Sequence, residues 1–478
     1  MKKKILFVIL PYILNEDKLG LKSFLSIPYG VLSIASFIKD YAEVRIFDCN
    51  TAIPWGHGLI KTLSDFKPDI VGVSMQFEIS YKYLEEALHY IQFFNTDIEC
   101  HLKKTEIIIG GESVNYNAEE ILKSHPEIDA VCIGEGELPV WDYITSGVFR
   151  QGWMTRNNST VTKYNAEELD DFIDIDYSLI DIELYQKFME ESYSPHVTGK
   201  DKRQFMIVSS RGCPFSCHFC RNSTNTDKSI RYASVNSIIA HVEQLIIKYE
   251  MNVLTFWDDQ LIYNQRRAKE LFKRLAVYNL RIEIPSGVSP SYLDKELLTL
   301  MRKAGVDTLY LALESGSHDV LKMMNKPVNL SQVRNLIPII RELDFFVMVF
   351  LVIGMPGETD KHRQETIDYI REIQPDLVSV RICVPVPGSK LRQECLDKGY
   401  IDNDFGKYLS VDAVINTPEY SAEYLNSECL RIMRLFNYTE NYRIKIGDYK
   451  TAKHYAEYVL SKYKNESYAI EMLERIPK

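Results

Sequence analysis

The ten-residue segment 211–220 constrains this chain more than any other part of it. Its sequence, RGCPFSCHFC, spaces Cys213, Cys217 and Cys220 by four and then three residues, so that all three fit on one short loop. A structural zinc site takes four ligands, usually as two separated pairs. Three cysteines can instead hold a [4Fe–4S] cluster and leave one iron open for chemistry. The alternatives are a zinc knuckle with His218 as the fourth ligand, or three ordinary buried cysteines.

An aromatic residue, Phe219, directly precedes the last of these cysteines. The pattern C-x3-C-x2-C with an aromatic before the final cysteine resembles the signature of radical S-adenosylmethionine (SAM) enzymes. The resemblance implies that the amino and carboxylate groups of SAM chelate the open iron. It also implies that one electron from the cluster cleaves SAM to a 5′-deoxyadenosyl radical. We therefore interpret Cys213, Cys217 and Cys220 as the catalytic cluster ligands, with Phe219 beside the cofactor.

The composition is that of a large globular protein. A chain of 478 residues with 46% hydrophobic and 26% charged residues predicts two or three domains. No apolar run reaches the length of a membrane span, and the N-terminal strand-like run is too short for a signal peptide, which indicates a cytoplasmic protein. The formal net charge of −10 argues against a nucleic-acid partner, because binding a phosphate backbone needs a basic face.

Nine cysteines in so long a chain do not indicate a disulfide framework, and an iron–sulfur loop requires a reducing compartment. We interpret the six cysteines outside the loop as packing residues: Cys49, Cys100, Cys132, Cys383, Cys395 and Cys429.

The first third of the chain alternates short apolar runs with helical patterns. The runs suit buried parallel strands, and the alternation predicts a doubly wound, Rossmann-like α/β domain over residues 1–160. Its binding edge is expected at the carboxyl ends of the strands. The predicted strands are 5–10, 44–48, 70–74, 106–110 and 130–133, and the predicted helices are 29–41, 59–66, 82–94 and 118–122.

The rest of the chain predicts a linker, a barrel and a helical extension. Residues 161–204 are acidic and rich in Tyr and Ser without a stable period, which indicates a linker. Residues 205–395 repeat six strand–helix units and predict a partial (β/α)6 barrel, open on one side, with the cysteines directly after its first strand. Residues 396–478 predict a small helical C-terminal domain. The predicted barrel strands are 206–210, 253–257, 281–285, 308–313, 347–353 and 377–384.

Acidic residues end two of the predicted barrel strands. Asp258 and Asp259 follow the second strand, and by resemblance to the family one of them accepts hydrogen bonds from the amino group of SAM. The alternative is a helix N-cap, a common role for Asp. Glu314, Ser315 and Gly316 follow the fourth strand and resemble the family's E-S-G-S motif, in which the carboxylate binds ribose hydroxyls. We expect Gly316 to allow a close approach of the backbone.

Two further strand ends resemble the family. Ile353 and Gly354 end the fifth strand in the sequence IGMPGE, which resembles the segment that lines the adenine side of SAM. The alternative is a Pro-Gly turn that leads into a capped helix. The sixth strand ends in the family-like sequence PVPGS, residues 385–389. The order of these strand ends after the cysteine loop is more specific than any one of them.

The N-terminal domain resembles the cobalamin-binding domain that precedes many radical SAM barrels. The resemblance rests on four segments: 28–30, 68–74, 109–112 and 134–137. It implies that cobalamin binds at the strand ends, with its nucleotide tail among Ser74, Gly110, Gly111, Gly134 and Glu135. The alternative is a domain of this type that has lost its cofactor.

The usual cobalt-ligand signature of such domains, D-x-H-x-x-G, is missing from this chain. The sequence His196-x-x-Gly199 comes nearest, but Ser194 stands where the pattern has Asp, and the segment lies in the predicted linker. We therefore do not assign His196 to cobalt, and the lower face of cobalt stays unassigned.

The resemblance as a whole implies a cobalamin-dependent radical SAM enzyme, most often a methyltransferase in this family, that alkylates an unactivated carbon. The first alternative is a related enzyme that catalyses a cyclisation, rearrangement or oxidation. A methylthiotransferase acting on transfer RNA would need an N-terminal cysteine motif that this chain lacks. An electron carrier would need fully ligated iron. We expect a small-molecule or peptide substrate, which the sequence does not name, and an electron donor such as flavodoxin or ferredoxin.

Overall fold

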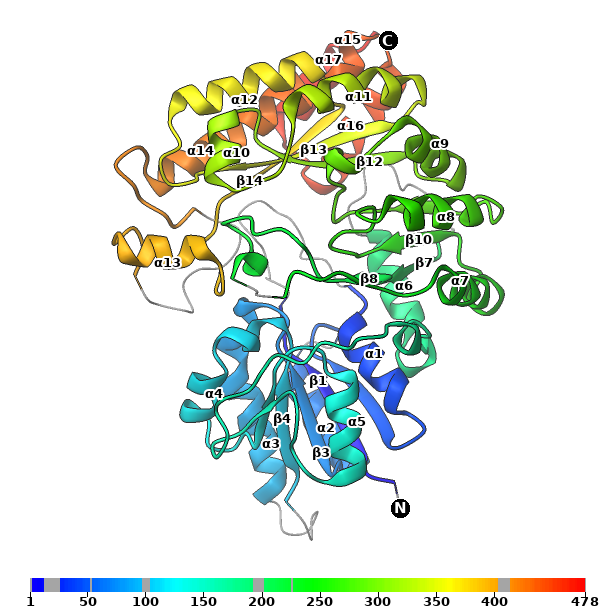
Figure 1. The fold of residues 1–478 in the computed structure, drawn as a ribbon, viewed down its shortest axis with the longest axis vertical. Helices are drawn as coiled ribbons and strands as arrows, with labels where there is room; N and C mark the ends of the chain where they lie inside the picture. The colour runs from blue at the N-terminus through cyan, green and yellow to red at the C-terminus, as the bar shows by residue number, and fades with distance from the viewer. Residues whose placement is uncertain are drawn as a thin grey trace. The chain divides into compact units, whose positions relative to one another are not determined.

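The computed structural model describes residues 2–12, 26–51, 54–96, 104–191, 202–224, 227–402 and 413–477. The chain divides into two compact units, Met1–Ser192 and Tyr193–Lys478, which run from blue to green and from green to red in Figure 1. Both have the predicted folds: a doubly wound α/β unit, then a partial barrel with a helical C-terminal part. No helix among the described residues is long and apolar enough to cross a membrane.

The first unit is built on one six-stranded sheet with the strand order β2-β1-β3-β4-β5-β6. The first five strands are parallel, and β6 runs antiparallel to β5 at the edge. The strands are β1 (Lys4–Ile9), β2 (Glu43–Asp48), β3 (Ile70–Ser74), β4 (Glu106–Gly110), β5 (Ala130–Cys132) and β6 (Trp153–Met154). The helices between them are α1 (Tyr29–Ile38), α2 (Trp55–Phe66), α3 (Leu84–Thr96), α4 (Ala118–Ser124) and α5 (Glu137–Ser146).

Helices cover both faces of this sheet (Figure 1). One core joins α2, α3 and α4 to side chains such as Val71 and Ile109, and the other joins α1 and α5 to Ile5 and Ile108. Because successive side chains of a strand point to opposite faces, strands buried on both sides read as continuous apolar runs. This is why the strand predictions agree closely with the structure.

The segment predicted as a linker, 161–204, contains ordered structure, and the break between the two units falls within it. Its first part packs on the first unit through the buried residues Phe172 and Tyr177 and continues into α6 (Ile182–Glu191). The hydroxyl of Tyr185 on α6 donates a hydrogen bond to the Asp48 carboxylate at 2.6 Å. Short 3-10 turns space the buried residues irregularly, so the sequence shows no period there.

The second unit holds six parallel strands in chain order. They form two three-stranded sheets, β7-β10-β11 and β12-β13-β14. Val288 joins the sheets, because its N–H donates to Tyr310 O at 2.7 Å and its carbonyl accepts from Ala312 N at 3.0 Å. The strands are β7 (Gln204–Ile207), β10 (Val253–Phe256), β11 (Arg281–Glu283), β12 (Thr308–Glu314), β13 (Phe346–Ile353) and β14 (Leu377–Ile382).

The helices of the barrel alternate with these strands, and a two-stranded ribbon, β8 (Ser210–Arg211) with β9 (Arg231–Tyr232), flanks the cysteine loop. The helices are α7 (Val235–Tyr249), α8 (Gln265–Leu275), α9 (Lys295–Ala304), α10 (His318–Met323), α11 (Leu330–Glu342), α12 (Asp360–Ile373) and α13 (Lys390–Asp397).

The C-terminal helices complete the open side of the barrel at β14. Asn437, on the π-helical turn Leu435–Thr439, accepts a hydrogen bond from Val378 N at 2.8 Å and donates one to Val378 O at 2.9 Å. An uncovered edge strand exposes unpaired backbone groups, and this side chain pairs two of them. The helices are α14 (Ala422–Arg434), α15 (Tyr442–Lys445), α16 (Tyr449–Lys462) and α17 (Ser467–Glu474).

Candidate functional site

The cysteine loop lies between β8 and β9 in the second unit. Its last turn is closed by a hydrogen bond from Cys220 N to Cys217 O at 2.9 Å. Two other segments hold the middle of the loop: His218 N donates to Met324 O at 2.9 Å, and His218 O accepts from Leu391 N at 3.0 Å. The backbone of the loop is therefore fixed by α10 and α13 without using the cysteine side chains.

The three thiols are partly or fully buried and lie close together. Burial raises the pKa of each, and that of Cys217 to about 11. The charges of Cys213 and Cys220 raise the pKa of Cys217 further, whereas the ammonium of Lys326 lowers the pKa of all three. Three soft sulfur ligands on one loop are the donor set that an iron–sulfur cluster takes. No three His, Cys, Asp or Glu side chains in the described chain are placed to hold a single metal ion.

Of the six other cysteines, Cys100 lies outside the described residues. The remaining five are free and buried: Cys49, Cys132, Cys383, Cys395 and Cys429. This is the environment expected of packing residues.

The two aspartates after β10 have different environments. Both oxygens of Asp258 are used: Oδ1 accepts from Ser209 N at 2.8 Å, and Oδ2 accepts from the hydroxyls of Ser209 and Ser210 at 2.7 and 2.6 Å. Its side chain is buried, which raises its pKa. Asp259 is exposed, and its charge raises the pKa of Cys213 and Cys220. Asp259 is therefore the aspartate beside the cysteine loop, whereas Asp258 ties β10 to β8.

Glu314 ends β12 with a left-handed backbone, φ +69°, next to a shift in the register between β12 and β13. Such a conformation is unfavourable for a non-glycine residue and is typical of functional sites. The carboxylate accepts a hydrogen bond from Lys326 Nζ at 2.8 Å, and both side chains are largely buried, with 10% and 13% exposed. Sequence reasoning found Glu314 but missed Lys326, because no motif marks the loop after α10.

Ser315 and Gly316 dock the following turn on α12. The hydroxyl of Ser315 lies 3.0 Å from that of Thr366, which also accepts from Gly316 N at 3.1 Å. A Cβ on Gly316 would lie 2.6 Å from the Cβ of Tyr369. The close approach that requires a glycine here is thus to α12, and the roles predicted for these two residues toward ribose stay predictions.

The end of β13 is held by a buried carboxylate and by the C-terminal region. Gly354, which follows the buried Ile353, adopts φ +91°, and its N–H and that of Met355 donate to Glu358 Oε2. Burial raises the pKa of Glu358 to about 7. The Tyr420 hydroxyl donates to Gly354 O at 2.5 Å.

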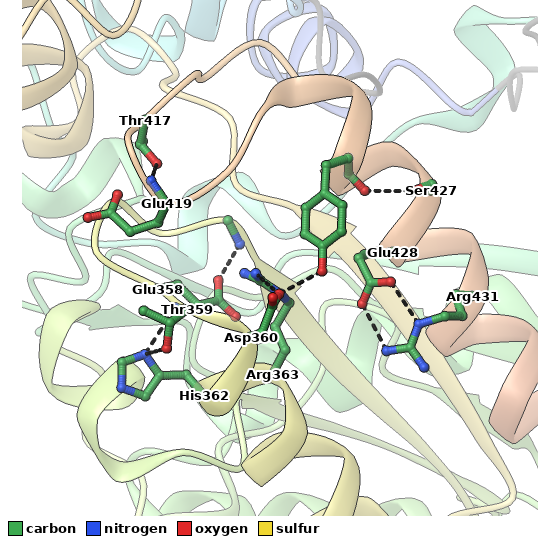
Figure 2. A network of polar contacts seen from close by, with 12 residues as sticks. Glu358, Thr359, Asp360, His362, Arg363, Thr417, Glu419, Ser427, Glu428 and Arg431 are labelled. Atoms are coloured by element: carbon green, nitrogen blue, oxygen red, sulfur yellow. Dashed lines mark hydrogen bonds and ion pairs between the residues drawn. The ribbon is translucent and has the colours of Figure 1, made fainter.

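A second layer of polar contacts surrounds this turn (Figure 2). Arg363 is buried, and one of its N–H groups donates to the Asp360 carboxylate at 2.6 Å. Asp360 also accepts from the Tyr424 hydroxyl of α14 at 2.6 Å. Figure 2 shows Glu358, Asp360 and Arg363 together at the start of α12, near Glu428 of α14. The C-terminal region, which matches no motif in the sequence, therefore contacts the predicted adenine-side turn.

In the first unit, the residues predicted for cobalamin gather along one sheet edge. Ser74 and Gly110 are direct partners at the carboxyl ends of β3 and β4. Gly111 adopts φ +110°, and a Cβ there would lie 2.5 Å from Met75 O. This edge includes the point where β1 and β3 are neighbours while β2 lies on the far side of β1, the topological switch point at which such sheets bind ligands.

The loop after β5 is tied to the chain beyond the sheet. A Cβ on Gly134 would lie 2.1 Å from Tyr164 O, and Glu135 accepts a hydrogen bond from Ala166 N at 2.9 Å. These contacts give both residues a structural role, and their predicted role toward cobalamin stays a prediction.

Ser113 lies near this edge in the chain but is enclosed by the protein. It follows Gly110 and Gly111, is fully buried, and its hydroxyl has no hydrogen-bond partner among the described residues. A buried hydroxyl without a partner is costly, but this one has no accessible surface and so does not face a ligand site at the sheet edge. His196 lies outside the described residues.

Two family models match the chain. Residues 23–142 match the B12 binding domain, and residues 207–370 match the radical SAM superfamily. The first match covers most of the six-stranded sheet, and the second runs from β7 into α12.

Relatives resemble the chain over most of its length. The cytidylyl-2-hydroxyethylphosphonate methyltransferase of Streptomyces wedmorensis is 27% identical, with 82% of each chain covered. The anaerobic magnesium-protoporphyrin IX monomethyl ester cyclase of Rubrivivax gelatinosus is 25% identical over 81% of this chain and 69% of its own. The fold is that of the cobalamin-dependent SAM radical enzyme OxsB, solved with aqua-cobalamin and SAM bound: TM-score 0.71, 16% identity, 98% of this chain and 72% of that one.

Proposed function

We propose that this chain, a radical SAM protein with an N-terminal B12-binding domain, is a cobalamin-dependent methyltransferase that acts on an unactivated carbon. The main support is that one chain matches both domain types. In addition, the second unit fixes three thiols on a loop whose backbone is held by other segments. The methyltransferase relative from Streptomyces wedmorensis, similar over 82% of this chain, supports methyl transfer.

In the second unit, different residues hold the cluster and the separate parts of SAM. Cys213, Cys217 and Cys220 bind three irons. Asp259, at the mouth beside them, accepts hydrogen bonds from the amino group of SAM, and Glu314 binds ribose hydroxyls. Ile353, Gly354 and the residues around them line the adenine. When bound, the cluster supplies the electron that cleaves SAM, and cobalamin supplies the methyl group.

The first unit holds cobalamin at the carboxyl edge of its sheet. The Ser74 hydroxyl offers a hydrogen bond to the nucleotide tail. Gly110 and Gly111 keep the ends of β4 free of side chains where the tail passes, and the loop that begins at Gly134 and Glu135 flanks it. The proposed reaction also needs a site that excludes water, because water would let the 5′-deoxyadenosyl radical undergo side reactions.

The second candidate is a reaction that joins or oxidises carbon atoms without methyl transfer. It is favoured by the relative from Rubrivivax gelatinosus, which is named as a cyclase and is similar over 81% of this chain. For both candidates we propose a small-molecule or peptide substrate and a reduced flavodoxin or ferredoxin as electron donor, in the cytoplasm.

The deciding experiment needs no knowledge of the substrate. Anaerobically reconstituted protein carrying cobalamin is reduced and given SAM with a deuterated methyl group. A methyltransferase releases S-adenosylhomocysteine and transfers the label to the corrinoid. Formation of 5′-deoxyadenosine without label in the corrinoid would favour the second candidate. If the protein forms neither S-adenosylhomocysteine nor 5′-deoxyadenosine, both candidate functions are contradicted.

A further inference from the structure

Two aromatic side chains meet at the carboxyl edge of the sheet in the first unit. Tyr12 follows the end of β1 and Phe77 follows the end of β3, and their ring centroids lie 5.2 Å apart with the ring planes tilted by 54°. The two strands are neighbours at the topological switch point, where sheets of this kind bind their ligands. The aromatic pair therefore lies at the proposed cobalamin site.

The Phe77 ring is exposed although the backbone around it is fixed. Met75 N donates to Gly110 O at 2.9 Å, and Ser80 N donates to Phe77 O at 3.0 Å where a short 3-10 helix begins. The ring itself is 44% exposed. Single exposed aromatic residues are common on protein surfaces, but this ring is held at a binding edge beside a second ring. Such an apolar surface fits the apolar face of a ligand.

The polar groups of Tyr12 are used within the protein. Its hydroxyl accepts a hydrogen bond from Ser26 N at 3.1 Å and donates one to Ser26 O at 3.4 Å, and its backbone N–H donates to Asn50 Oδ1 at 2.8 Å. Burial and the charge of Asp48 raise the pKa of the hydroxyl, so that it keeps its proton at neutral pH. A protonated phenol is a poor metal ligand, and what Tyr12 offers to a ligand is its ring.

The neighbouring polar side chains at this edge are engaged in the same way. Asn50 donates to Leu10 O at 3.2 Å and to Asp48 Oδ1 at 2.7 Å. The other oxygen of Asp48 accepts from the Tyr185 hydroxyl at 2.6 Å. The ends of β1 and β2 thus direct their polar groups to one another, and the aromatic pair is the surface they leave for a ligand.

We propose that the aromatic pair of Tyr12 and Phe77 packs against the lower face of the corrin and leaves cobalt without a protein ligand on that face. The inference rests on the proposed function, and it assigns the face that the missing D-x-H-x-x-G signature leaves open. The face of a corrin ring is largely apolar, so its burial against two aromatic rings contributes to affinity through the hydrophobic effect.

Binding of the corrinoid tests the contribution of the Phe77 ring. Full-length protein is titrated anaerobically with hydroxocobalamin. Phe77→Ala should weaken binding about tenfold, because it removes apolar area that the corrin buries, and Phe77→Leu, which keeps much of that area, should lose less. The matched control is Phe93→Ala, which removes a ring that is 61% exposed near the C-terminal end of α3 and should bind like the wild type.

Electron paramagnetic resonance of the bound corrinoid, reduced to Co(II), tests for a ligand on cobalt. Wild-type protein should show no nitrogen splitting, and His57→Ala, which removes an exposed histidine from the first turn of α2 at the same sheet edge, should give the same spectrum. Phe77→His should add the nitrogen splitting of a bound imidazole, because it places a strong metal ligand at the contact.

Two results would overturn the inference and leave the proposed function standing. One is nitrogen splitting in the wild-type spectrum, since a nitrogen ligand would then occupy the face assigned to the two rings. The other is wild-type affinity for hydroxocobalamin in Phe77→Ala. Wild-type protein that binds no corrinoid would instead contradict the proposed function.

Discussion

Two neighbouring aspartates show how position decides the role of a residue. Asp258 is buried and accepts three hydrogen bonds from Ser209 and Ser210, whereas Asp259 is exposed beside the cysteine loop. Sequence reasoning treated the two alike, because the strand period places them one residue apart but does not show which side chain the neighbouring strand captures. The difference leads to opposite predictions.

Asp258→Asn should lower the free energy of unfolding by about 2–3 kcal/mol, because an amide cannot accept all three of these hydrogen bonds. Asp259→Asn should leave stability unchanged and weaken SAM binding about ten- to a hundredfold. Chemical denaturation and anaerobic titration measure the two effects. The assignment fails if the two variants exchange these behaviours, or if Asp259→Asn binds SAM like the wild type.

The cysteine spacing leads to the second prediction at this scale. Replacing any one of Cys213, Cys217 and Cys220 by Ala should abolish formation of 5′-deoxyadenosine, and the triple variant should lose its iron, since each thiolate binds one iron of the cluster. The matched control is Cys429→Ala, which removes a buried cysteine of α14 and should retain about four irons. A triple variant that still cleaves SAM would overturn the cluster assignment.

Lys326 and Ser113 mark the limit of prediction from sequence at the residue scale. The cysteines are recognisable because their spacing along the chain is itself the constraint on the loop. Lys326 meets Glu314 across twelve residues, and the Ser113 hydroxyl is buried without a partner among the described residues. The contact of Lys326 with Glu314 and the burial of Ser113 both arise from tertiary packing, so the local sequence does not predict them.

At the scale of elements, the turn after β13 is held both by a carboxylate of its own and by the distant C-terminal region. Glu358 accepts from the N–H groups of Gly354 and Met355, and Tyr420 donates to Gly354 O. A Cβ on Gly354 would also lie 2.6 Å from a methyl carbon of Leu425 on α14. Sequence reasoning predicted β13 and its glycine from the motif. It could not predict that the C-terminal region packs there, because its residues match no motif.

Glu358 should make stability depend on pH. Burial raises its pKa from 4.5 to about 7 in the folded state. Between these values the folded protein keeps a proton that the unfolded chain has released, so the free energy of unfolding falls as pH rises through this window, by about 3 kcal/mol in all. Glu358→Gln cannot titrate and should lack this fall. Denaturation at several pH values from 4 to 8 measures the difference between the two proteins, and parallel curves would contradict the prediction.

Tyr420→Phe tests whether the C-terminal region supports the SAM site. The variant keeps the ring but removes the hydrogen bond to Gly354 O, so it should weaken SAM binding by about 1 kcal/mol, or roughly fivefold. The control is Tyr424→Phe, which loses a hydroxyl bonded to Asp360 and leaves the Gly354 carbonyl untouched. Equal SAM affinity in wild type and Tyr420→Phe would restrict this contact to a role in folding.

At the scale of the whole molecule, the order of two α/β units and a helical extension could be predicted because buried parallel strands leave continuous apolar runs. The segment between the units could not, since Phe172 and Tyr177 are buried on short turns that leave no period. The pairing of Asn437 with the edge of β14 could not be predicted either. Nothing in the sequence distinguishes an asparagine that bonds a strand edge from any other asparagine.

Cobalamin binding tests the molecule as a whole, because the proposed reaction needs both units. Purified protein supplied with hydroxocobalamin should retain about one corrinoid per chain with a base-off spectrum, because the proposed site holds the nucleotide tail at the sheet edge, away from cobalt. No histidine is expected to replace the base, since the D-x-H-x-x-G signature is missing. His196→Ala should leave that spectrum unchanged. Ser74→Ala should weaken retention, because it removes a partly exposed hydroxyl at the carboxyl end of β3, and Ser146→Ala, an exposed serine at the far end of α5, serves as its control. A protein that retains no corrinoid would favour the reaction without methyl transfer and leave the first unit a structural domain.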